Sequence, residues 1–307
     1  FGKTLQRIKH PIFDFPIITT NLSYLKLIKI ELKKNKIKKY RIILEPLKKN
    51  TAPAILASSL IKEIPMKQPI VFLSSDNIMG KVNIFNKALL RHLKYLTDNN
   101  IFIFGIKPIS PSSEYGYFLS KKTKNILNKV TKFIEKPKKS KVKIILKQKG
   151  YMNAGIFYAT KASLINNFKK KQSLIYKNCH KSVEKSKLIN NVYYLNKRYF
   201  KNINEISFDY AILEKSQDIN GIKLNLPLID LGNWKEIWKF FKKNNSQNFI
   251  KKNTFYKPWG KYINLFSGKG FLLKELIIKP NSSIRLQKHV HRSERWFINA
   301  GKPRITI

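Results

Sequence analysis

Two aspartates follow apolar runs of the sequence in a way that is typical of metal-phosphate sites. Asp76 comes after the run Ile70–Leu73, and Asp230 comes after Leu224–Ile229 and before Gly232. Two carboxylates at strand ends can share one Mg²⁺, whose charge offsets that of a triphosphate during phosphoryl-type transfer. The alternative is that each aspartate caps a turn or a helix, which is the commoner role of an isolated Asp after a strand.

Two further polar groups also follow apolar runs. Glu45 comes after the first strand and leads to Asn50 and Thr51, and we expect Thr51 to cap a helix that has Pro53 in its first turn. The pair Glu135-Lys136 follows Val130–Ile134 and places an acid beside a base. Taken alone, the first group is a helix start and the second is a solvated ion pair.

Small residues mark another place where a ligand can approach the backbone. The triplet Asn153-Ala154-Gly155 precedes the β-type run Ile156–Tyr158. Alanine and glycine leave room beside the main chain. Each of these signals is weak when it stands alone.

Alternating strands and helices must position these side chains. Buried strands are expected at Tyr40–Leu44, Ile70–Leu73 and Ile101–Ile106, with helices at Thr51–Glu63 and Lys81–Leu96. This alternation predicts a mainly parallel α/β sheet, whose ligands lie beyond the carboxyl ends of the strands.

The pattern changes after Phe241. Residues 242–255 are polar and charged, as in a linker, and no helix is expected beyond them. Short β-type runs follow instead, at Phe271–Ile278, Arg285–Leu286, Trp296–Ile298 and Pro303–Ile307. We therefore expect an α/β domain over residues 1–241 and the beginning of a small all-β domain over residues 256–307.

The formal net charge of +45 raises the alternative of a basic nucleic-acid-binding protein. Only 8 of the 62 basic residues are arginine, although arginine is the side chain that reads phosphates and bases bidentately. The lysines are spread over the whole chain together with many Ile and Asn, which are encoded by A/T-rich codons. Compositional drift explains the charge better, so we expect no nucleic-acid partner.

The remaining bulk properties are those of an ordinary enzyme. The longest apolar runs, such as Ile101–Ile106, are far shorter than the ~18–20 residues of a spanning helix, so no membrane partner is expected. The single cysteine, Cys179, cannot form an intramolecular disulfide and fits a reducing cytoplasm.

The order of the motifs is more specific than any one of them. In order along the chain the motifs are Glu45-Pro46, Asn50-Thr51-Ala52-Pro53-Ala54, Asp76, Tyr115-Gly116-Tyr117, Phe133-Ile134-Glu135-Lys136-Pro137, Asn153-Ala154-Gly155-Ile156-Phe157, Phe208-Asp209-Tyr210-Ala211, Glu214-Lys215 and Asp230-Leu231-Gly232-Asn233-Trp234. With this ordered series the chain resembles the mannose-1-phosphate guanylyltransferase family, from Thr4-Leu5-Gln6-Arg7 to about Phe241.

The resemblance implies a Rossmann-like sugar nucleotidyltransferase that makes GDP-mannose and pyrophosphate from GTP and mannose 1-phosphate. By matching positions, the resemblance implies that Glu45, Asn50 and Thr51 contact the nucleotide and that Asp76 and Asp230 bind Mg²⁺. It implies that the mannose is bound by Tyr115, Gly116, Glu135 and Asn153, and that Lys136 lies near the sugar phosphate. Asp209 is expected to be structural or to support a contact residue, and not to be catalytic. The resemblance leaves a homo-oligomer open.

The chain also departs from the family pattern. Lys49, Asn77 and Glu114 stand where the family usually has Arg, His and Gly. The glycine-rich, Arg-containing loop with which the family begins does not precede Thr4. We therefore expect that the chain is incomplete at its beginning and inactive by itself.

The segment from Asn281 to Gly301 resembles the first cupin motif of type II mannose-6-phosphate isomerases. Two histidines one residue apart on a strand face the same side and can bind one metal ion. The resemblance makes Gln287, His289 and Glu294 ligands of Zn²⁺ or a similar metal, and His291 can exchange roles with His289. The fourth ligand of the family lies in a later motif that the chain does not reach, so an isomerase site is expected to be half built. The extension can equally be structural only.

Overall fold

The computed structural model describes residues 1–108, 111–123, 126–232, 253–268, 270–284 and 293–306. The chain forms two compact units, Phe1–Leu228 and Ile229–Ile307. The expected linker 242–255 lies outside the described residues up to residue 252. Each unit is described below by itself.

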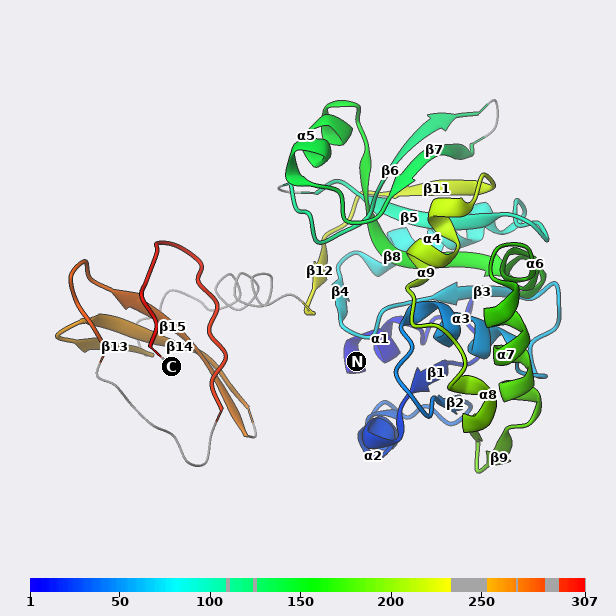
Figure 1. The fold of residues 1–307 in the computed structure, drawn as a ribbon, viewed down its shortest axis with the longest axis horizontal. Coiled ribbons are helices and arrows are strands. Elements are labelled where there is room, and N and C mark those ends of the chain that lie inside the picture. The colour runs from blue at the N-terminus through cyan, green and yellow to red at the C-terminus, as the bar shows by residue number, and fades with distance from the viewer. Residues whose placement is uncertain (109–110, 124–125, 233–252, 269, 285–292, 307) are drawn as a thin grey trace. The chain divides into compact units, whose positions relative to one another are not determined.

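A four-stranded sheet lies in the first unit (Figure 1). Its order is β1 (Ile17–Thr20), β2 (Arg41–Leu44), β10 (Val192–Tyr194) and β9 (Lys187–Ile189), with β2 parallel to both of its neighbours. Helices α1 (Gly2–Arg7) and α2 (Leu25–Lys34) cover it. Leu5, Ile28 and Leu32 from these helices pack against Ile42 and Leu44 of β2.

A six-stranded sheet forms the centre of the same unit. Its order is β3 (Pro69–Phe72), β8 (Tyr151–Thr160), β5 (Ile101–Ile106), β11 (Ile219–Leu224), β7 (Asn128–Ile134) and β6 (Tyr117–Lys122). Of its described pairings only β5 with β11 is parallel. The prediction of a mainly parallel sheet is therefore wrong for this sheet, because β6 and β7 form a hairpin and β8 runs against both β3 and β5.

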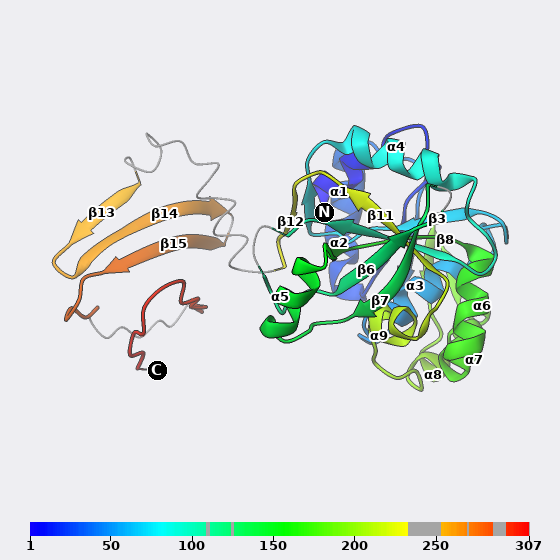
Figure 2. The same ribbon diagram turned by 90° about the horizontal axis from the view of Figure 1, so that it is seen from above.

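Both faces of the six-stranded sheet are covered, as Figure 2 shows. Phe102 and Phe104 of β5 pack with Phe85 of α4 (Val82–Leu93) on one face. Ile101 and Ile103 belong to the core on the other face, which contains residues of α3 (Thr51–Leu60), α6 (Lys161–Lys171) and α7 (Ser173–Glu184). All six residues of β5 are buried, which is why this strand reads as a continuous apolar run.

Two helices of the first unit are shorter than expected. Helix α3 ends at Leu60 because Ile61 has extended backbone angles, and the ammonium group of the buried Lys161 donates to the carbonyls of Ile61 and Ile64. The expected cap Thr51 is wrong by one residue, since Asn50 is the N-cap and its Oδ1 accepts from the backbone N–H of Thr51. Helix α4 spans Val82–Leu93 where Lys81–Leu96 was expected.

A half-buried arginine joins β2 to the chain after α3. Arg41 Nε donates to Glu63 Oε1 at 2.6 Å, and the Tyr193 hydroxyl donates to Glu63 Oε2 at 2.6 Å. A second guanidinium nitrogen of Arg41 donates to Asn191 Oδ1 at 2.9 Å. One planar side chain thus connects three segments that are distant in the sequence.

The short elements of the first unit, some of which carry the residues discussed below, are η1 (Leu22–Tyr24), β4 (Asn77–Met79), α5 (Lys139–Lys147), α8 (Lys197–Phe200), α9 (Phe208–Ala211) and η2 (Leu213–Lys215). Strand β12 (Leu228–Asp230) crosses the boundary between the two units. Among the described residues no helix has the length and apolarity to cross a bilayer.

The second unit contains an antiparallel sheet of β13 (Thr254–Lys257), β14 (Gly260–Gly268) and β15 (Phe271–Ile278). The strand expected at Phe271–Ile278 is confirmed. Those expected at Trp296–Ile298 and over residues 303–306 are wrong, because these described residues have no strand structure. The run Arg285–Leu286 lies outside the described part of the chain.

Candidate functional site

Asn153 holds together several of the polar residues singled out in the sequence. It lies within β8, so the expectation that the strand begins only at Ile156 is wrong. Its backbone N–H donates to the Gly116 carbonyl at 2.8 Å, and its Nδ2 donates to Asp209 Oδ1 at 2.9 Å. Its Oδ1 accepts from the Gly155 N–H at 3.2 Å, where Gly155 has a φ of 65°. The orientation of this side chain is therefore fixed at both its amide nitrogen and its amide oxygen.

Glu135 lies against the same segment. A Cβ atom added to Gly116 would be 2.5 Å from Glu135 Oε2 and 3.6 Å from Asn153 Cβ. The backbone N–H of Glu135 donates to Glu214 Oε1 at 2.9 Å. We call Gly116, Glu135, Lys136, Asn153 and Asp209 the Glu135 cluster. Tyr115, directly before Gly116, packs on the small core formed by Tyr117, Val142 and Ile145.

The electrostatics of the Glu135 cluster favour protonated carboxyls. Burial, together with the charges of Asp209 and Glu214, raises the pKa of Glu135 to about 7, and the charge of Lys136 opposes this shift. Burial also raises the pKa of Asp209 to about 6, against its hydrogen bonds and the charge of Lys136. These two carboxyls therefore titrate near neutral pH, which is common where a site is built to bind a polar ligand.

The helix start at Asn50-Thr51 is joined to the Glu135 cluster through α9. Thr51 Oγ1 accepts from the Phe208 N–H at 2.8 Å, and the next residue, Asp209, is the partner of Asn153. The Phe208 ring packs on Phe157 of β8 with centroids 4.8 Å apart. Helix α9 thus connects the start of α3 with the middle of β8.

Glu45 follows β2, and its backbone N–H donates to the Thr20 carbonyl at 2.7 Å. Burial raises the pKa of its carboxyl to about 7. Its Oε1 is buried and has no hydrogen-bond partner among the described residues. A buried acceptor without a partner is destabilising, so this atom is suited to a donor that a ligand brings.

Asp76 is exposed and lies in the turn between β3 and β4, as expected for a residue after the strand. The turn touches β8 on one side, where Asn77 Nδ2 donates to the Ala154 carbonyl at 3.4 Å and Ser74 Oγ is 3.6 Å from the Cβ position of Gly155. Asp76 therefore belongs to the surroundings of the same β8 segment as the Glu135 cluster.

The other expected metal ligands lie in the second unit. Asp230 ends β12, and its Oδ1 accepts from the Gly232 N–H at 2.8 Å, as in a turn. The apolar run before it is divided between β11 and β12. Glu294 is exposed, and its Oε2 accepts from Trp296 Nε1 at 3.1 Å. Gln287 and His289 lie outside the described residues, as does His291.

The described residues contain no group of three or more His, Cys, Asp or Glu side chains that could hold a metal ion. Mg²⁺ does not need such a group, because it usually binds through one or two carboxylates, water and substrate phosphates. The exposed carboxylate of Asp76 fits this requirement.

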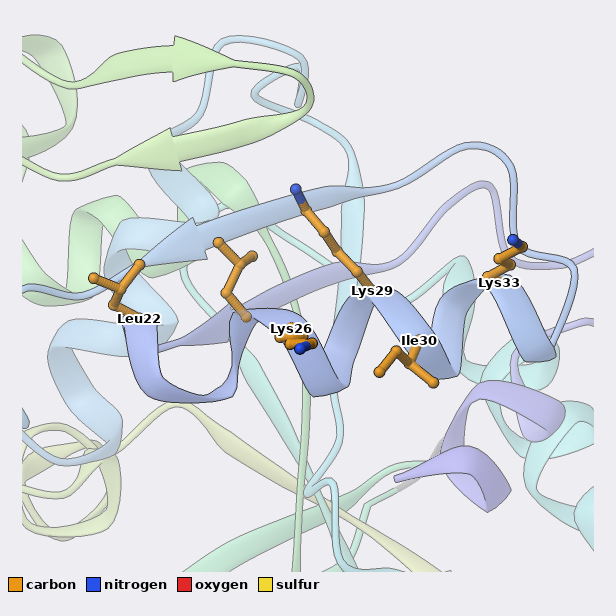
Figure 3. A pocket seen from close by; sticks show the side chains of 6 residues that line it. Leu22, Lys26, Lys29, Ile30 and Lys33 are labelled. Atoms are coloured by element: carbon orange, nitrogen blue, oxygen red, sulfur yellow. The ribbon is translucent and has the colours of Figure 1, made fainter.

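A hollow along η1 and α2 is separate from the candidate residues (Figure 3). It is lined by Leu22, Leu25, Lys26, Lys29, Ile30 and Lys33 and by none of the candidate residues.

Two acidic residues, one in the Glu135 cluster and one beside it, had no assigned ligand role in the sequence. Asp209 was expected to be structural, and Glu214 was only part of a motif. They contact Asn153 and Glu135 from positions 56 and 79 residues further along the chain. The one sequence signal for them was their place in the ordered series of motifs.

Comparisons with known proteins match both parts of the chain. The nucleotidyl transferase family model matches residues 3–247, and the model of the mannose-6-phosphate isomerase C-terminal region matches residues 244–307. Neither model describes a nucleic-acid-binding protein. The expected fold class, an α/β nucleotidyltransferase domain followed by an isomerase-type, cupin-like region, is confirmed.

Relatives agree with this assignment. The mannose-1-phosphate guanylyltransferase of Salmonella montevideo is 25% identical over 99% of the chain and 80% of its own length. The alginate biosynthesis protein AlgA of Pseudomonas putida is 22% identical over 100% of the chain and 78% of its own length.

Among solved structures, the mannose-6-phosphate isomerase of Helicobacter pylori has a TM-score of 0.66 at 24% identity, over 75% of this chain and 90% of that one. The protein described as mannose-1-phosphate geranyltransferase of Thermus thermophilus also has a TM-score of 0.66, at 20% identity, over 79% of this chain and 69% of that one. With a family model that covers most of its length, the chain belongs to the nucleotidyl transferase family.

Proposed function

We propose that the protein transfers GMP from GTP to mannose 1-phosphate, which gives GDP-mannose and pyrophosphate. The observation that carries the proposal is the convergence of three candidate groups on the β8 segment Asn153–Gly155. These groups are the Glu135 cluster, the turn of Asp76, and the start of α3, which is joined to β8 through α9. The names of the relatives support mannose 1-phosphate and GTP as the substrates.

In this proposal each group has one task. Tyr115, Gly116, Glu135 and Asn153 bind the mannose, Lys136 lies by its phosphate, and Glu45, Asn50 and Thr51 contact the nucleotide. A protonated or charged Glu135 can donate to or accept from sugar hydroxyls, and Asn153 can present its amide only in the direction that Asp209 sets. Because Gly116 has no side chain, the Glu135 carboxyl can lie close to its backbone, in space that a Cβ atom would fill.

The reaction needs positioning more than acid or base chemistry. A phosphate oxygen of mannose 1-phosphate attacks the α-phosphorus of GTP in line, and the bond to the pyrophosphate oxygen breaks as the new P–O bond forms. Asp76 and Asp230 are the residues that would hold Mg²⁺, which would supply positive charge that offsets the triphosphate. Lys136 supplies a second positive charge at the sugar phosphate.

Substitution of Glu135 by Gln tests the sugar site. Isothermal titration should show that Glu135→Gln weakens binding of mannose 1-phosphate and GDP-mannose by about tenfold or more, because a hydrogen bond to a charged or polarised group contributes about 1.5–3 kcal/mol. GTP affinity should stay within about twofold. The control Glu184→Gln removes an exposed carboxylate from α7. Equal weakening of GTP and sugar binding would contradict the assignment of Glu135.

The match of residues 244–307 favours a second activity, the interconversion of fructose 6-phosphate and mannose 6-phosphate. We propose Glu294, Gln287 and His289 as ligands of Zn²⁺ or a similar metal for it. Incubation of a full-length version of the protein with fructose 6-phosphate and Zn²⁺ should yield mannose 6-phosphate in an enzyme-coupled assay. If no product forms while Zn²⁺ binds, the region has a structural role only. Both activities use phosphorylated metabolites of the cytoplasm, where we place the protein.

A further inference from the structure

Helix α1 makes two hydrogen bonds to the turn that carries Asp76, and the proposed reaction does not yet use them. Thr4 Oγ1 donates to the Ser75 carbonyl at 3.2 Å. The Arg7 guanidinium donates through Nη2 to the Asn77 carbonyl at 2.7 Å. The two acceptors are the residues immediately before and after Asp76, so α1 fixes the backbone on both sides of this carboxylate.

The helix itself is firmly placed. Leu5 is 1% exposed and packs with Ile28 and Leu32 of α2 in the core of the four-stranded sheet. Thr4 and Arg7 are 8% and 5% exposed, so both donors act where water competes little for the carbonyls. On its other side the turn is attached to β8 through Asn77 Nδ2.

Arg7 is a poor choice for stability alone. Its Nη1 is buried and has no hydrogen-bond partner among the described residues, and burial lowers the pKa of its guanidinium. A buried donor without a partner costs about 1–3 kcal/mol. A side chain with a single donor could make the hydrogen bond to the Asn77 carbonyl without leaving a second donor buried and unpartnered. The stability of the fold therefore does not explain why position 7 is an arginine.

We propose that Thr4 and Arg7 are positioning residues, which hold the Asp76 carboxylate in the direction in which it binds the divalent metal. The inference rests on the proposed metal role of Asp76. A carboxylate whose backbone is fixed in advance binds a cation more tightly, because less conformational entropy is lost on binding. Thr4 and Arg7 need not touch metal or substrate for this effect.

The test measures metal binding directly, with Mn²⁺ as a paramagnetic substitute for Mg²⁺. Free Mn²⁺ is followed by its electron paramagnetic resonance signal in the presence of GDP-mannose, for Thr4→Val, Thr4→Ser and Arg7→Lys. Thr4→Val should weaken Mn²⁺ binding about fivefold, which corresponds to one hydrogen bond, and Thr4→Ser should restore it. Arg7→Lys should weaken it by at least as much, since Lys lacks the planar geometry of the guanidinium.

Gln6→Met is the matched control, because Gln6 is exposed on the same helix. Urea unfolding of every variant separates positioning from stability. If Thr4→Val and Arg7→Lys lower only the free energy of unfolding and leave Mn²⁺ affinity unchanged, the positioning role is wrong. Asp76→Ala identifies the other failure, because unchanged Mn²⁺ binding in this variant would overturn the metal role of Asp76, and the proposed positioning with it.

Discussion

At the scale of single residues, two glutamate carboxyls lie in buried surroundings that disfavour their ionised form. Glu45 and Glu135 both have pKa values raised to about 7, chiefly by burial. In an unfolded chain a glutamate titrates near 4.5. Between these values the folded protein binds more protons than the unfolded chain, so its stability falls as the pH rises. These two carboxyls therefore lower the stability of the protein at neutral pH.

Glu45→Gln should remove the part of this stability loss at neutral pH that comes from Glu45. The variant should be more stable than the parent protein at pH 8, by about 1–3 kcal/mol, and nearly equal to it at pH 5. Urea unfolding at the two pH values measures the difference, with the exposed Glu184→Gln on α7 as control. A stabilisation of the same size at both pH values would mean that the charge of Glu45 is not its cause.

Gly116→Ala should separate binding from stability. The added Cβ would lie 2.5 Å from Glu135 Oε2, the end of a flexible side chain that can move, and 3.0 Å from the Phe133 ring, which needs to shift by only a few tenths of an ångström. We expect GDP-mannose affinity to fall by about tenfold or more with a loss of stability below about 1 kcal/mol. In the control Gly105→Ala the Cβ meets the buried ring of Phe118, and stability should fall much more. A large loss of stability in Gly116→Ala would contradict this reasoning.

At the scale of elements, the apolar pattern predicted which segments form strands and helices better than how they pair. Ile101–Ile106 matches β5 in full, because six consecutive residues are buried on both faces. Strand direction was not predictable, because it depends on how β8 returns between β3 and β5. Asp209 was missed as a partner of Asn153 because it lies on a four-residue helix, far away in sequence.

The N-cap of α3 is a residue whose backbone conformation restricts which side chains it can carry. Asn50 is the N-cap and has a φ of 68°, a conformation that Asn and Gly adopt more easily than Ala. Asn50→Ala should therefore lower the free energy of unfolding by about 1–2 kcal/mol, while Asn50→Gly should cost only a few tenths. Thermal unfolding of both variants measures this. Equal losses would show that the positive φ of this residue is not what favours Asn here.

At the scale of the whole molecule, the two units differ greatly in core size. The first contains two large buried clusters on either side of its six-stranded sheet. In the second, the described buried apolar residues are Ile263 and Leu265 of β14. The change of pattern in the sequence lies after Phe241, whereas the first compact unit ends at Leu228.

Hydrogen exchange should show the difference directly. Amides of β5 should exchange slowest, whereas those of β14 should exchange roughly a hundredfold faster or more, because opening the small sheet exposes little apolar surface. Mass spectrometry of peptides that cover β5 and β14 measures both rates in one sample. Similar protection in the two strands would mean that the second unit is stabilised by more than its described core.

The hydrogen bonds of Arg7 and Arg41 have a consequence for reading chains of this composition. Lysine serves as the cation at most basic positions, yet these two buried or half-buried sites, each facing backbone or side-chain acceptors in fixed directions, have arginine. A codon bias toward A and T lets lysine replace arginine wherever only a positive charge is needed. Exposed arginines such as Arg91 remain as well, and buried Lys161 serves two carbonyls, so arginine by itself indicates nothing. In other lysine-rich proteins, buried arginines whose acceptors lie in fixed directions are nevertheless positions to inspect for hydrogen bonds that need a planar guanidinium.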